Sequence, residues 1–285
     1  MTIARYEVFM KVVEQGNFTK AAEQLNMTQS AVSHAIASLE KEIGYALLNR
    51  SKQAKISTTV LADRLIPHMM QILRSEAIIR EEISVENHQL EGTLKIGAFT
   101  SAASQLLPPM IAQLKTNHPC VKVVLFEGTY DEILTWLTNG TVDIGFVMNT
   151  EEKGHLHKIL IHEDELVVGM PHNHPFAQLE VLDIKQLEGI DFIMPRASYQ
   201  RQVLACLTDH NVTPNVLMEV LHCDTIINMA SQGIGVTIGP KLLFQSYEQM
   251  LHKPLLQDTS RPICLAYRIG SPTIEAFLVS NQLEC

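Results

Sequence analysis

The chain has 285 residues, of which 46% are hydrophobic and 19% are charged. This composition is typical of a globular protein with one large domain or two to three smaller ones. No window approaches about eighteen consecutive apolar residues, and the first residues lack a basic stretch followed by an apolar one. We therefore expect neither a membrane span nor a signal peptide, and a location in the cytoplasm.

The net charge of −9 is unevenly distributed along the chain. Residues 1–60 contain seven Lys or Arg and five Glu, a net charge of +2, whereas the remainder carries −11. A slightly positive head on an acidic body is the asymmetry expected of a protein whose N-terminal part binds nucleic acid.

The N-terminal pattern predicts three short helices. Apolar residues recur at spacings of three and four over residues 3–15, which indicates an amphipathic helix. A second helix is predicted to run through Leu25, and a third to run to Ile43 after a tight turn. The residues predicted to cap or end these helices are Gly16, Asn17 or Thr19, Thr28 and Gly44.

The third helix has two different faces. Its apolar stripe, which we expect to pack on the first two helices, consists of Val32, Ile36, Leu39 and Ile43. The other face carries short or planar hydrogen-bonding side chains near the N-terminal end: Gln29, Ser30, Ser33 and His34. Such a face can enter a major groove, where Gln reads adenine edges and Ser reads several bases. The pattern alone leaves open a three-helix core with a solvated polar face.

A basic stretch follows Gly44. Leu47 and Leu48 are expected to anchor it, and Arg50, Lys52 and Lys55 alternate with smaller residues. This arrangement suits a two-stranded wing that lies along phosphates. A solvated basic hairpin is the alternative.

Together these stretches resemble the winged helix-turn-helix of LysR-type transcriptional regulators. The resemblance is carried by FTKAAEQL at residues 18–25, TQSAVSHAI at residues 28–36, and LLNR at residues 47–50. The chain departs from the family pattern with Thr28 in place of Ser and Leu48 in place of Phe. The predicted DNA-contacting residues are Thr19, Lys20, Thr28, Gln29, Ser30, Ser33, His34, Arg50, Lys52 and Lys55.

A long periodic segment follows, from Thr59 to about Asn87. Its apolar residues include steps of three, four and seven, which predicts a coiled-coil-like helix; they are Leu61, Leu65, Ile72, Ile79, Ile83 and Leu90. In the family such a linker helix pairs two subunits, so the resemblance implies a homodimer or homotetramer. An amphipathic helix lying on its own domain is the alternative. Pro67 is expected to kink the helix or to shift its start.

From Glu91 onwards, strands and helices alternate, which predicts a mostly parallel sheet with right-handed crossovers. The sequence "helix, Gly, strand" occurs in each half, so two α/β lobes are expected, and a strand at residues 263–267 would return the chain to the first lobe. This part resembles the effector domain of the family, which is built like a type II periplasmic binding protein. The predicted fold class is thus α + α/β, with a head (1–58), a linker helix (59–90) and an effector domain (91–285). Its lobe I would comprise about 91–162 and 267–285, and its lobe II about 163–266.

Ligands of open α/β sheets bind at the C-terminal ends of strands, which in a two-lobed domain means the cleft between the lobes. Thr100 and Ser101 follow the first strand, where hydroxyl and N–H groups at a helix N-terminus suit a carboxylate or phosphate. Plain N-capping would use the same residues. Arg201 could pair with an anion or be an ordinary surface arginine. The other candidate effector-binding residues are Thr129, Met148, Ser198, Gln200 and Thr225.

Signals for metal, redox and catalytic chemistry are weak. His155 and His157, like His172 and His174, have strand spacing, but no Cys cluster or H-E-x-x-H motif accompanies them, so no metal or other cofactor is expected. The five cysteines form no C-x-x-C pair, and nothing in the sequence near Cys206 and Cys223 indicates a reactive thiol. No nucleophile–base motif appears, so we do not expect an enzyme.

The predicted function is that of a sequence-specific DNA-binding transcriptional regulator whose promoter binding is modulated by a small-molecule effector between the lobes. Its expected partners are double-stranded promoter DNA, a small metabolite that could be an anion, further copies of the chain, and RNA polymerase if it activates transcription. Two other hypotheses are a metabolite-sensing module whose head contacts only proteins, and an α/β enzyme.

Overall fold

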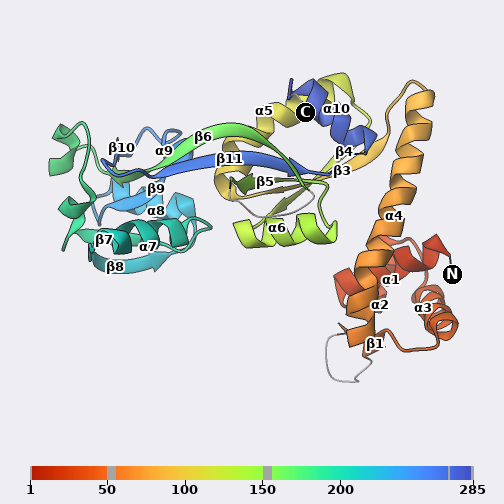
Figure 1. Ribbon diagram of the computed structural model, residues 1–285. Helices are drawn as coiled ribbons and strands as arrows, with labels where there is room; N and C mark the ends of the chain where they lie inside the picture. Colours follow the sequence, from red (N-terminus) through yellow and green to blue (C-terminus); the bar gives the residue numbers. More distant parts are fainter. Residues whose placement is uncertain (1, 50–55, 150–155, 269, 284–285) are drawn as a thin grey trace. The chain divides into compact units, whose positions relative to one another are not determined.

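Figure 1 shows the computed structural model, which describes residues 2–49, 56–149, 156–268 and 270–283. The chain forms two compact units. The first comprises Met1–His88 with Asn139–Thr141, and the second comprises Gln89–Thr138 and Val142–Cys285. Within the described residues, no helix combines the length and the apolar character needed to cross a membrane.

Three helices form the N-terminal head and confirm the three predicted helices: α1 (Ile3–Gln15), α2 (Phe18–Gln24) and α3 (Gln29–Ile43). Gly16 and Gly44 follow α1 and α3 with φ angles of 58° and 84°. Glycine adopts this left-handed conformation without the steric penalty of a Cβ atom, which explains why both helices end there.

The predicted apolar stripe of α3 is the centre of the head. Val32, Ile36 and Leu39 are fully buried and belong to the same core as Phe9 and Val12 of α1. Full burial of each such side chain contributes roughly 1.5–3 kcal/mol relative to exposure. The stripe therefore fixes the rotation of α3 about its own axis and leaves the opposite face outward.

The base of the wing is a two-stranded antiparallel ladder of β1 (Leu48–Asn49) and β2 (Ser57–Thr58), in which Leu48 pairs with Thr58. Glu40 of α3 holds this ladder in place, because its carboxylate accepts the N–H groups of Leu47 and Leu48 at 2.8 and 3.2 Å.

The linker is one helix, α4 (Val60–Glu86), and Thr59 caps it by accepting the N–H of Ala62 at 3.2 Å. The expected shift of its start does not occur: Pro67 lies inside the helix, where it costs one backbone hydrogen bond. Ala62 and Met69 are buried in the core of the head. Further along, apolar side chains of α4 are exposed.

The second unit contains two separate hydrophobic cores, and each defines one lobe. In lobe I, β3 pairs in parallel with β4 and β5. Figure 1 shows α5 and α10 on one side of these strands and α6 on the other. The elements of lobe I are β3 (Gly92–Ala98), η1 (Ala102–Leu106), α5 (Leu107–Asn117), β4 (Val121–Glu127), α6 (Tyr130–Asn139), β5 (Ile144–Met148) and α10 (Pro272–Ser280).

The helix predicted from about Thr100 to Thr116 is present, but a π-helical segment, η1, interrupts it. Pro108 and Pro109 follow η1 and have no N–H to donate to the carbonyls of Ser104 and Gln105. The regular i to i−4 ladder is therefore broken at this point, where a π-turn is one of the available adjustments.

Lobe II packs short strands and helices around the second core. In it β7 and β8 form a parallel pair. Its elements are η2 (Pro175–Gln178), η3 (Ile184–Leu187), β7 (Asp191–Pro195), α7 (Gln200–Asp209), β8 (Asn215–Val220), α8 (Cys223–Ser231), β9 (Thr237–Pro240), α9 (Lys241–Phe244) and β10 (Leu251–Pro254).

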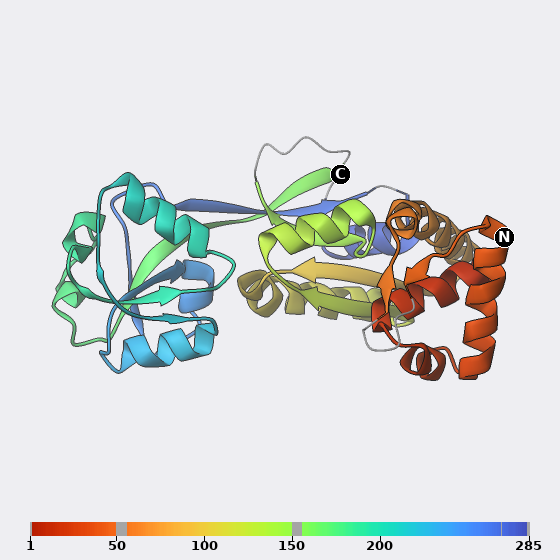
Figure 2. The same ribbon diagram turned by 90° about the horizontal axis from the view of Figure 1, so that it is seen from below.

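Two long strands connect the lobes: β6 (His157–Met170) and β11 (Ser260–Tyr267). They are paired with each other in the seven-stranded order β10-β6-β11-β5-β3-β4, with β9 also on β6. Figures 1 and 2 show both strands running through the two lobes. From Ile263 onwards β11 also pairs with β5, which confirms that this strand returns to lobe I.

The prediction of a mostly parallel sheet is wrong, because the sheet is mixed. The strand β6 pairs antiparallel with β9, β10 and β11, and β11 also pairs antiparallel with β5. The sequence prediction assumed a helical crossover between successive strands. Instead β6 carries the chain out to lobe II and β11 carries it back beside β6, so the two strands run in opposite directions.

Candidate functional site

The exposed face of α3 has the composition that the sequence indicated. Gln29, Ser30 and His34 are exposed, and Ser33 is half-buried. Thr28 is exposed too, and its hydroxyl caps α3 by accepting the N–H of Ala31 at 3.2 Å, while sharing a 3.0 Å hydrogen bond with Ser30. The result is an array of hydrogen-bond donors and acceptors that is suited to base edges.

The start of α2 holds two further predicted residues. Asn17, and not Thr19, caps this helix, because its side-chain oxygen accepts the N–H groups of Thr19 and Lys20 at 2.8 and 3.0 Å. Thr19 and Lys20 lie in the exposed first turn, where the hydroxyl of Thr19 and the charge of Lys20 suit a phosphate.

The wing is described only at its base. The Asn49 side chain donates to the carbonyl of Thr58 at 2.8 Å and to the hydroxyl of Ser57 at 3.2 Å. The predicted contacts Arg50, Lys52 and Lys55 lie outside the described residues.

The residues predicted to bind an effector lie on both lobes. At the start of the first helix of lobe I, Thr100 is exposed and Ser101 is 3% exposed. Thr129 caps α6, because its hydroxyl oxygen accepts the N–H of Glu132 at 3.4 Å, and its own N–H and hydroxyl both donate to the Glu132 carboxylate at 2.8 Å. The two bonds to the carboxylate, the backbone one first, lower the pKa of Glu132. The hydroxyl of Thr129 is thus already used in a local cap.

Arg201 has a local partner as well. It pairs with Asp131 of α6 at 2.9 Å, and their side chains are 84% and 65% exposed. An ion pair this exposed contributes little to stability, but it links α7 of lobe II to α6 of lobe I. The remaining candidates are at or near element ends: half-buried Met148, Ser198 and Gln200, and exposed Thr225.

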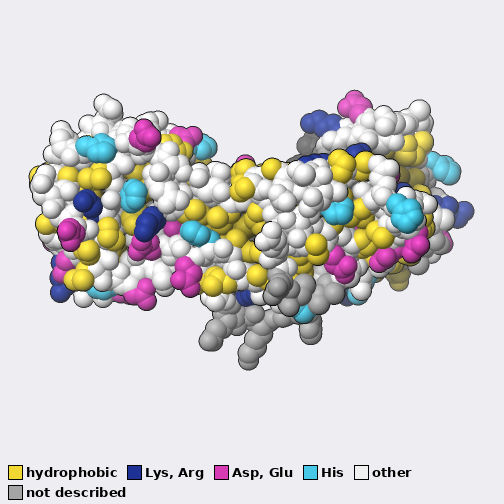
Figure 3. All heavy atoms as spheres, turned by 90° about the horizontal axis from the view of Figure 1, so that it is seen from above, with side chains coloured by type: hydrophobic (Ala, Val, Ile, Leu, Met, Phe, Trp, Pro, Cys, Tyr) yellow, Lys and Arg dark blue, Asp and Glu magenta, His cyan; other side chains and the backbone are white. Residues whose placement is uncertain are grey.

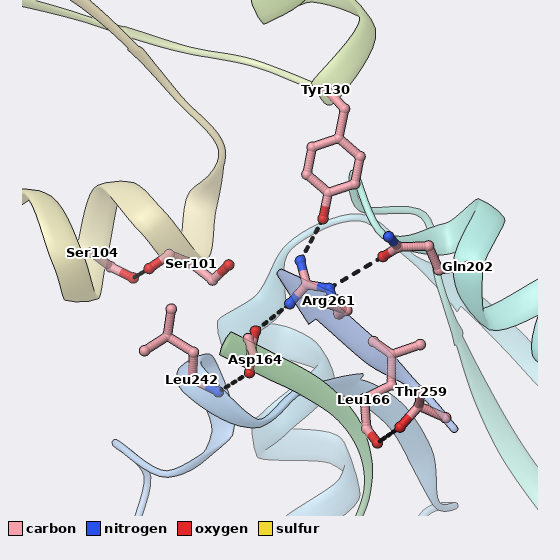
Figure 4. Close-up of polar contacts among 9 residues, drawn as sticks. All are labelled: Ser101, Ser104, Tyr130, Asp164, Leu166, Gln202, Leu242, Thr259 and Arg261. Carbon is pink, nitrogen blue, oxygen red and sulfur yellow. Dashed lines mark hydrogen bonds and ion pairs between the residues drawn. The ribbon is translucent and has the colours of Figure 1, made fainter. Parts of the chain in front are cut away.

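The most buried polar group at the junction of the lobes was not predicted. Arg261 of β11 is 1% exposed and forms an ion pair with Asp164, its cross-strand partner on β6. Its Nη2 donates to the hydroxyl of Tyr130 at 2.5 Å, and its Nε donates to the side-chain oxygen of Gln202 at 3.2 Å. Figure 4 shows three side chains, from β6, α6 and α7, converging on the guanidinium that β11 carries. We call Arg261, Asp164, Tyr130 and Gln202 the arginine hub.

Packing around the arginine hub holds it in place. Phe99 lies under the guanidinium at 6.0 Å and meets the Tyr130 ring edge-on, with 4.8 Å between ring centroids. The second carboxylate oxygen of Asp164 accepts the N–H of Leu242 at 2.9 Å. Ser101 and Ser104 lie on the lobe I helix next to the hub in Figure 4.

The thiols of lobe II are not activated. Burial raises the pKa of Cys223, whose sulfur lies 3.8 Å from the hydroxyl of Tyr199, and burial raises the pKa of Cys206 too. Burial also raises the pKa of Tyr199 well above its usual value. Both thiols are therefore poor nucleophiles at neutral pH.

Within the described part of the chain, no three or more His, Cys, Asp or Glu side chains gather as metal ligands would. His155 lies outside that part. Figure 3 shows the histidines of one face scattered rather than clustered. His172 instead hydrogen-bonds the carbonyl of Glu248 at 2.9 Å, and His174 accepts the N–H of Phe176 at 3.2 Å.

No local signal for the arginine hub is present in the sequence. Asp164 stands between Glu163 and Glu165, so nothing marks it as the one buried acid of that stretch, and Arg261 lies near the start of its strand. Their pairing depends on the register between β6 and β11, 97 positions apart in sequence. Nothing local to either strand specifies that register.

The fold, the exposed face of α3 and the arginine hub define a class of protein. It has a winged helix-turn-helix head, a linker helix and a two-lobed binding domain. Two family profiles match the chain: "Bacterial regulatory helix-turn-helix protein, lysR family" over residues 3–62, and "LysR substrate binding domain" over residues 87–279. The chain therefore belongs to the LysR family, and it is a DNA-binding transcriptional regulator with an effector-binding domain.

Similar proteins cover the whole architecture. The uncharacterized HTH-type transcriptional regulator YvbU of Bacillus subtilis is 30% identical over 84% of this chain and 81% of its own length. The DNA-binding transcriptional dual regulator OxyR of Escherichia coli is 24% identical over 95% and 91%.

Solved structures share the fold. A full-length, singly substituted OxyR from Pseudomonas aeruginosa has a TM-score of 0.79 at 22% identity, covering 99% of this chain and 95% of its own. Full-length CbnR complexed with its target DNA has a TM-score of 0.68 at 19% identity, covering 99% of both chains.

Proposed function

We propose that the chain binds a roughly two-fold-symmetric promoter site through α3 of paired heads, and that a small molecule between its lobes alters this binding. The observation that supports DNA reading is the outward face of α3, which carries Gln29, Ser30, Ser33 and His34 at the N-terminal half of the helix. That half is the part of a recognition helix that contacts base edges. The region around the arginine hub is our candidate for the effector site, because groups from both lobes meet there.

The roles that we propose for the three parts of the chain are the ones predicted from the sequence. We assign residues 1–58 to DNA binding, 59–90 to subunit pairing and 91–285 to effector binding. A contact with RNA polymerase, in the case of activation, and a location in the cytoplasm belong to the same proposal. The proposed DNA contacts include Arg50, Lys52 and Lys55, whose positive charges suit phosphates.

A selection of DNA sequences bound by the full-length protein tests this function. An inverted-repeat site is the expected result. On that site Ser33→Ala and Gln29→Ala should relax the preference for particular base pairs, since a good base contact contributes about 1–3 kcal/mol of discrimination. Lys20→Ala should weaken binding to all sequences to a similar degree and reduce its salt dependence.

Ser38→Ala is the matched control, because Ser38 lies in the C-terminal half of α3, away from the proposed reading face. It should leave both affinity and preference unchanged. A folded protein that shows no sequence preference, or a Ser38→Ala change as large as that of Ser33→Ala, would contradict the proposal.

A further inference from the structure

The arginine hub is electrically balanced. The side chains of Arg261 and Asp164 are each 1% exposed, and they face each other across adjacent strands of one sheet. Asp164 is held from its other side by the N–H of Leu242. The pair therefore belongs to the sheet itself, and the guanidinium charge is already compensated by a fixed carboxylate.

Two other cations, on elements next to the arginine hub, have acidic partners too. Arg201 pairs with Asp131 at 2.9 Å, and Lys241, next to Leu242, pairs with Glu165 at 2.7 Å. Each of these pairs matches one cation with one acid.

Two further acids add negative charge. Glu132 accepts hydrogen bonds from Thr129, and Asp224 accepts one from the hydroxyl of Tyr247 at 2.5 Å. These donors are neutral and do not cancel a carboxylate charge. These described side chains, Arg261, Arg201 and Lys241 with Asp164, Asp131, Glu165, Glu132 and Asp224, therefore carry three positive and five negative charges.

This balance decides which kind of molecule binds well. An anion that enters the junction loses its hydration and is attracted by Arg261 but repelled by Asp164, so the lost hydration is not recovered. A neutral molecule loses much less. The guanidinium already donates hydrogen bonds to one neutral oxygen from each lobe, the hydroxyl of Tyr130 in lobe I and the amide oxygen of Gln202 in lobe II.

We propose that the effector of this regulator carries no net charge and presents a hydroxyl or carbonyl oxygen that replaces Gln202 or Tyr130 as an acceptor of Arg261. Replacement of either side chain changes how one lobe is tied to β11. The inference deepens the proposed function and rests on it, because it takes the junction of the lobes as the effector site.

Fractionation of cell metabolites tests the charge class directly. An extract is passed at pH 7 over an anion exchanger and then a cation exchanger, and each fraction is added to wild-type full-length protein on its selected DNA site. The fraction that passes both columns should change the footprint. Activity found only in the fraction eluted from the anion exchanger would overturn the inference. If no fraction acts, the proposed effector response fails, and the charge balance is decided by the next experiment.

Small carboxylates probe Arg261 without knowledge of the effector. Formate and acetate, compared with chloride at equal ionic strength, should not raise the melting temperature of the wild-type protein. They should raise that of Asp164→Ala by at least about 2 °C, because a free carboxylate can occupy the vacated position beside Arg261. Glu165→Ala is the matched control and should gain nothing, since its partner Lys241 is half-exposed.

Two results would contradict the charge balance. One is a stabilisation of the wild type by acetate that disappears in Arg261→Met. The other is an Asp164→Ala protein that gains no stability from either carboxylate. If Asp164→Ala does not fold, Asp164→Asn replaces it, and acetate must then stabilise that variant more than the wild type.

Discussion

At the scale of single residues, Arg261 is the buried cation that joins the two lobes. It is fully buried, charged, and bonded to groups on three other elements. A buried ion pair gives little net stability over a hydrophobic pair of the same shape, but it becomes costly when one member is removed.

Removal of Arg261 alone should therefore be far worse than removal of the pair. We predict that Arg261→Met lowers the free energy of unfolding by about 3–5 kcal/mol, because Asp164 is left as an uncompensated buried carboxylate. The double variant Asp164→Leu/Arg261→Met should recover most of this loss. Urea denaturation of the full-length protein checks both, and a double variant as unstable as the single one would contradict the account.

The lobe II thiols give a prediction about pH. Burial raises the pKa of Cys206 and Cys223, and a raised pKa means that less thiolate is present at a given pH. Alkylation of both residues at about pH 7.5 should therefore be slower than that of free cysteine, and it should keep rising with pH beyond about pH 9. Mass spectrometry of iodoacetamide-labelled protein measures this. Labelling of either residue faster than free cysteine would show that the thiol is activated after all.

At the scale of elements, prediction succeeded where the signal is local. The helices of the head follow from apolar spacing and from cap residues next to it, and α3 begins and ends where Thr28 and Gly44 indicate. The mixed sheet could not be derived in this way, because strand direction depends on how β6 and β11 pair. The helix α10 was missed because it is apolar on nearly every side, which removes the periodic signal. The arginine hub was missed for the same reason as the mixed sheet, because it depends on how β6 and β11 pair.

The cap of α3 gives a prediction at this scale. Thr28→Ala removes the acceptor for the N–H of Ala31 and should cost about 1 kcal/mol of stability. Thr19→Ala is the matched control in the same head, since Asn17 does the capping there, and it should stay within about 0.5 kcal/mol. Thermal unfolding of both variants measures the two losses of stability. Equal losses would show that Thr28 does not act as a cap.

At the scale of the whole molecule, the linker helix exposes apolar surface that a single chain does not cover. Ile72, Ile79 and Ile83 of α4 are 41%, 59% and 58% exposed. They follow the spacings of four and seven that a helix–helix seam requires. We predict that Ile79→Glu dissociates the oligomer, whereas Gln71→Glu, which adds the same charge at an exposed polar position of α4, does not. Analytical ultracentrifugation measures the change, and an unchanged mass for Ile79→Glu would place the interface elsewhere.

The central claim links the head to the lobes: a molecule bound at the arginine hub changes how paired α3 helices sit on DNA. The measurement that tests it most directly is a footprint of the full-length protein on its selected site, with and without cell metabolites, for the wild type and for Tyr130→Phe. Tyr130→Phe keeps the ring against Phe99 and removes only the bond to Arg261. We predict that metabolites change the spacing or extent of the wild-type footprint, and that Tyr130→Phe alters the size of this response, because the bond between Arg261 and lobe I is then absent from the start, while basal DNA binding persists. A footprint that metabolites leave unchanged, or a response that Tyr130→Phe does not affect, would contradict it.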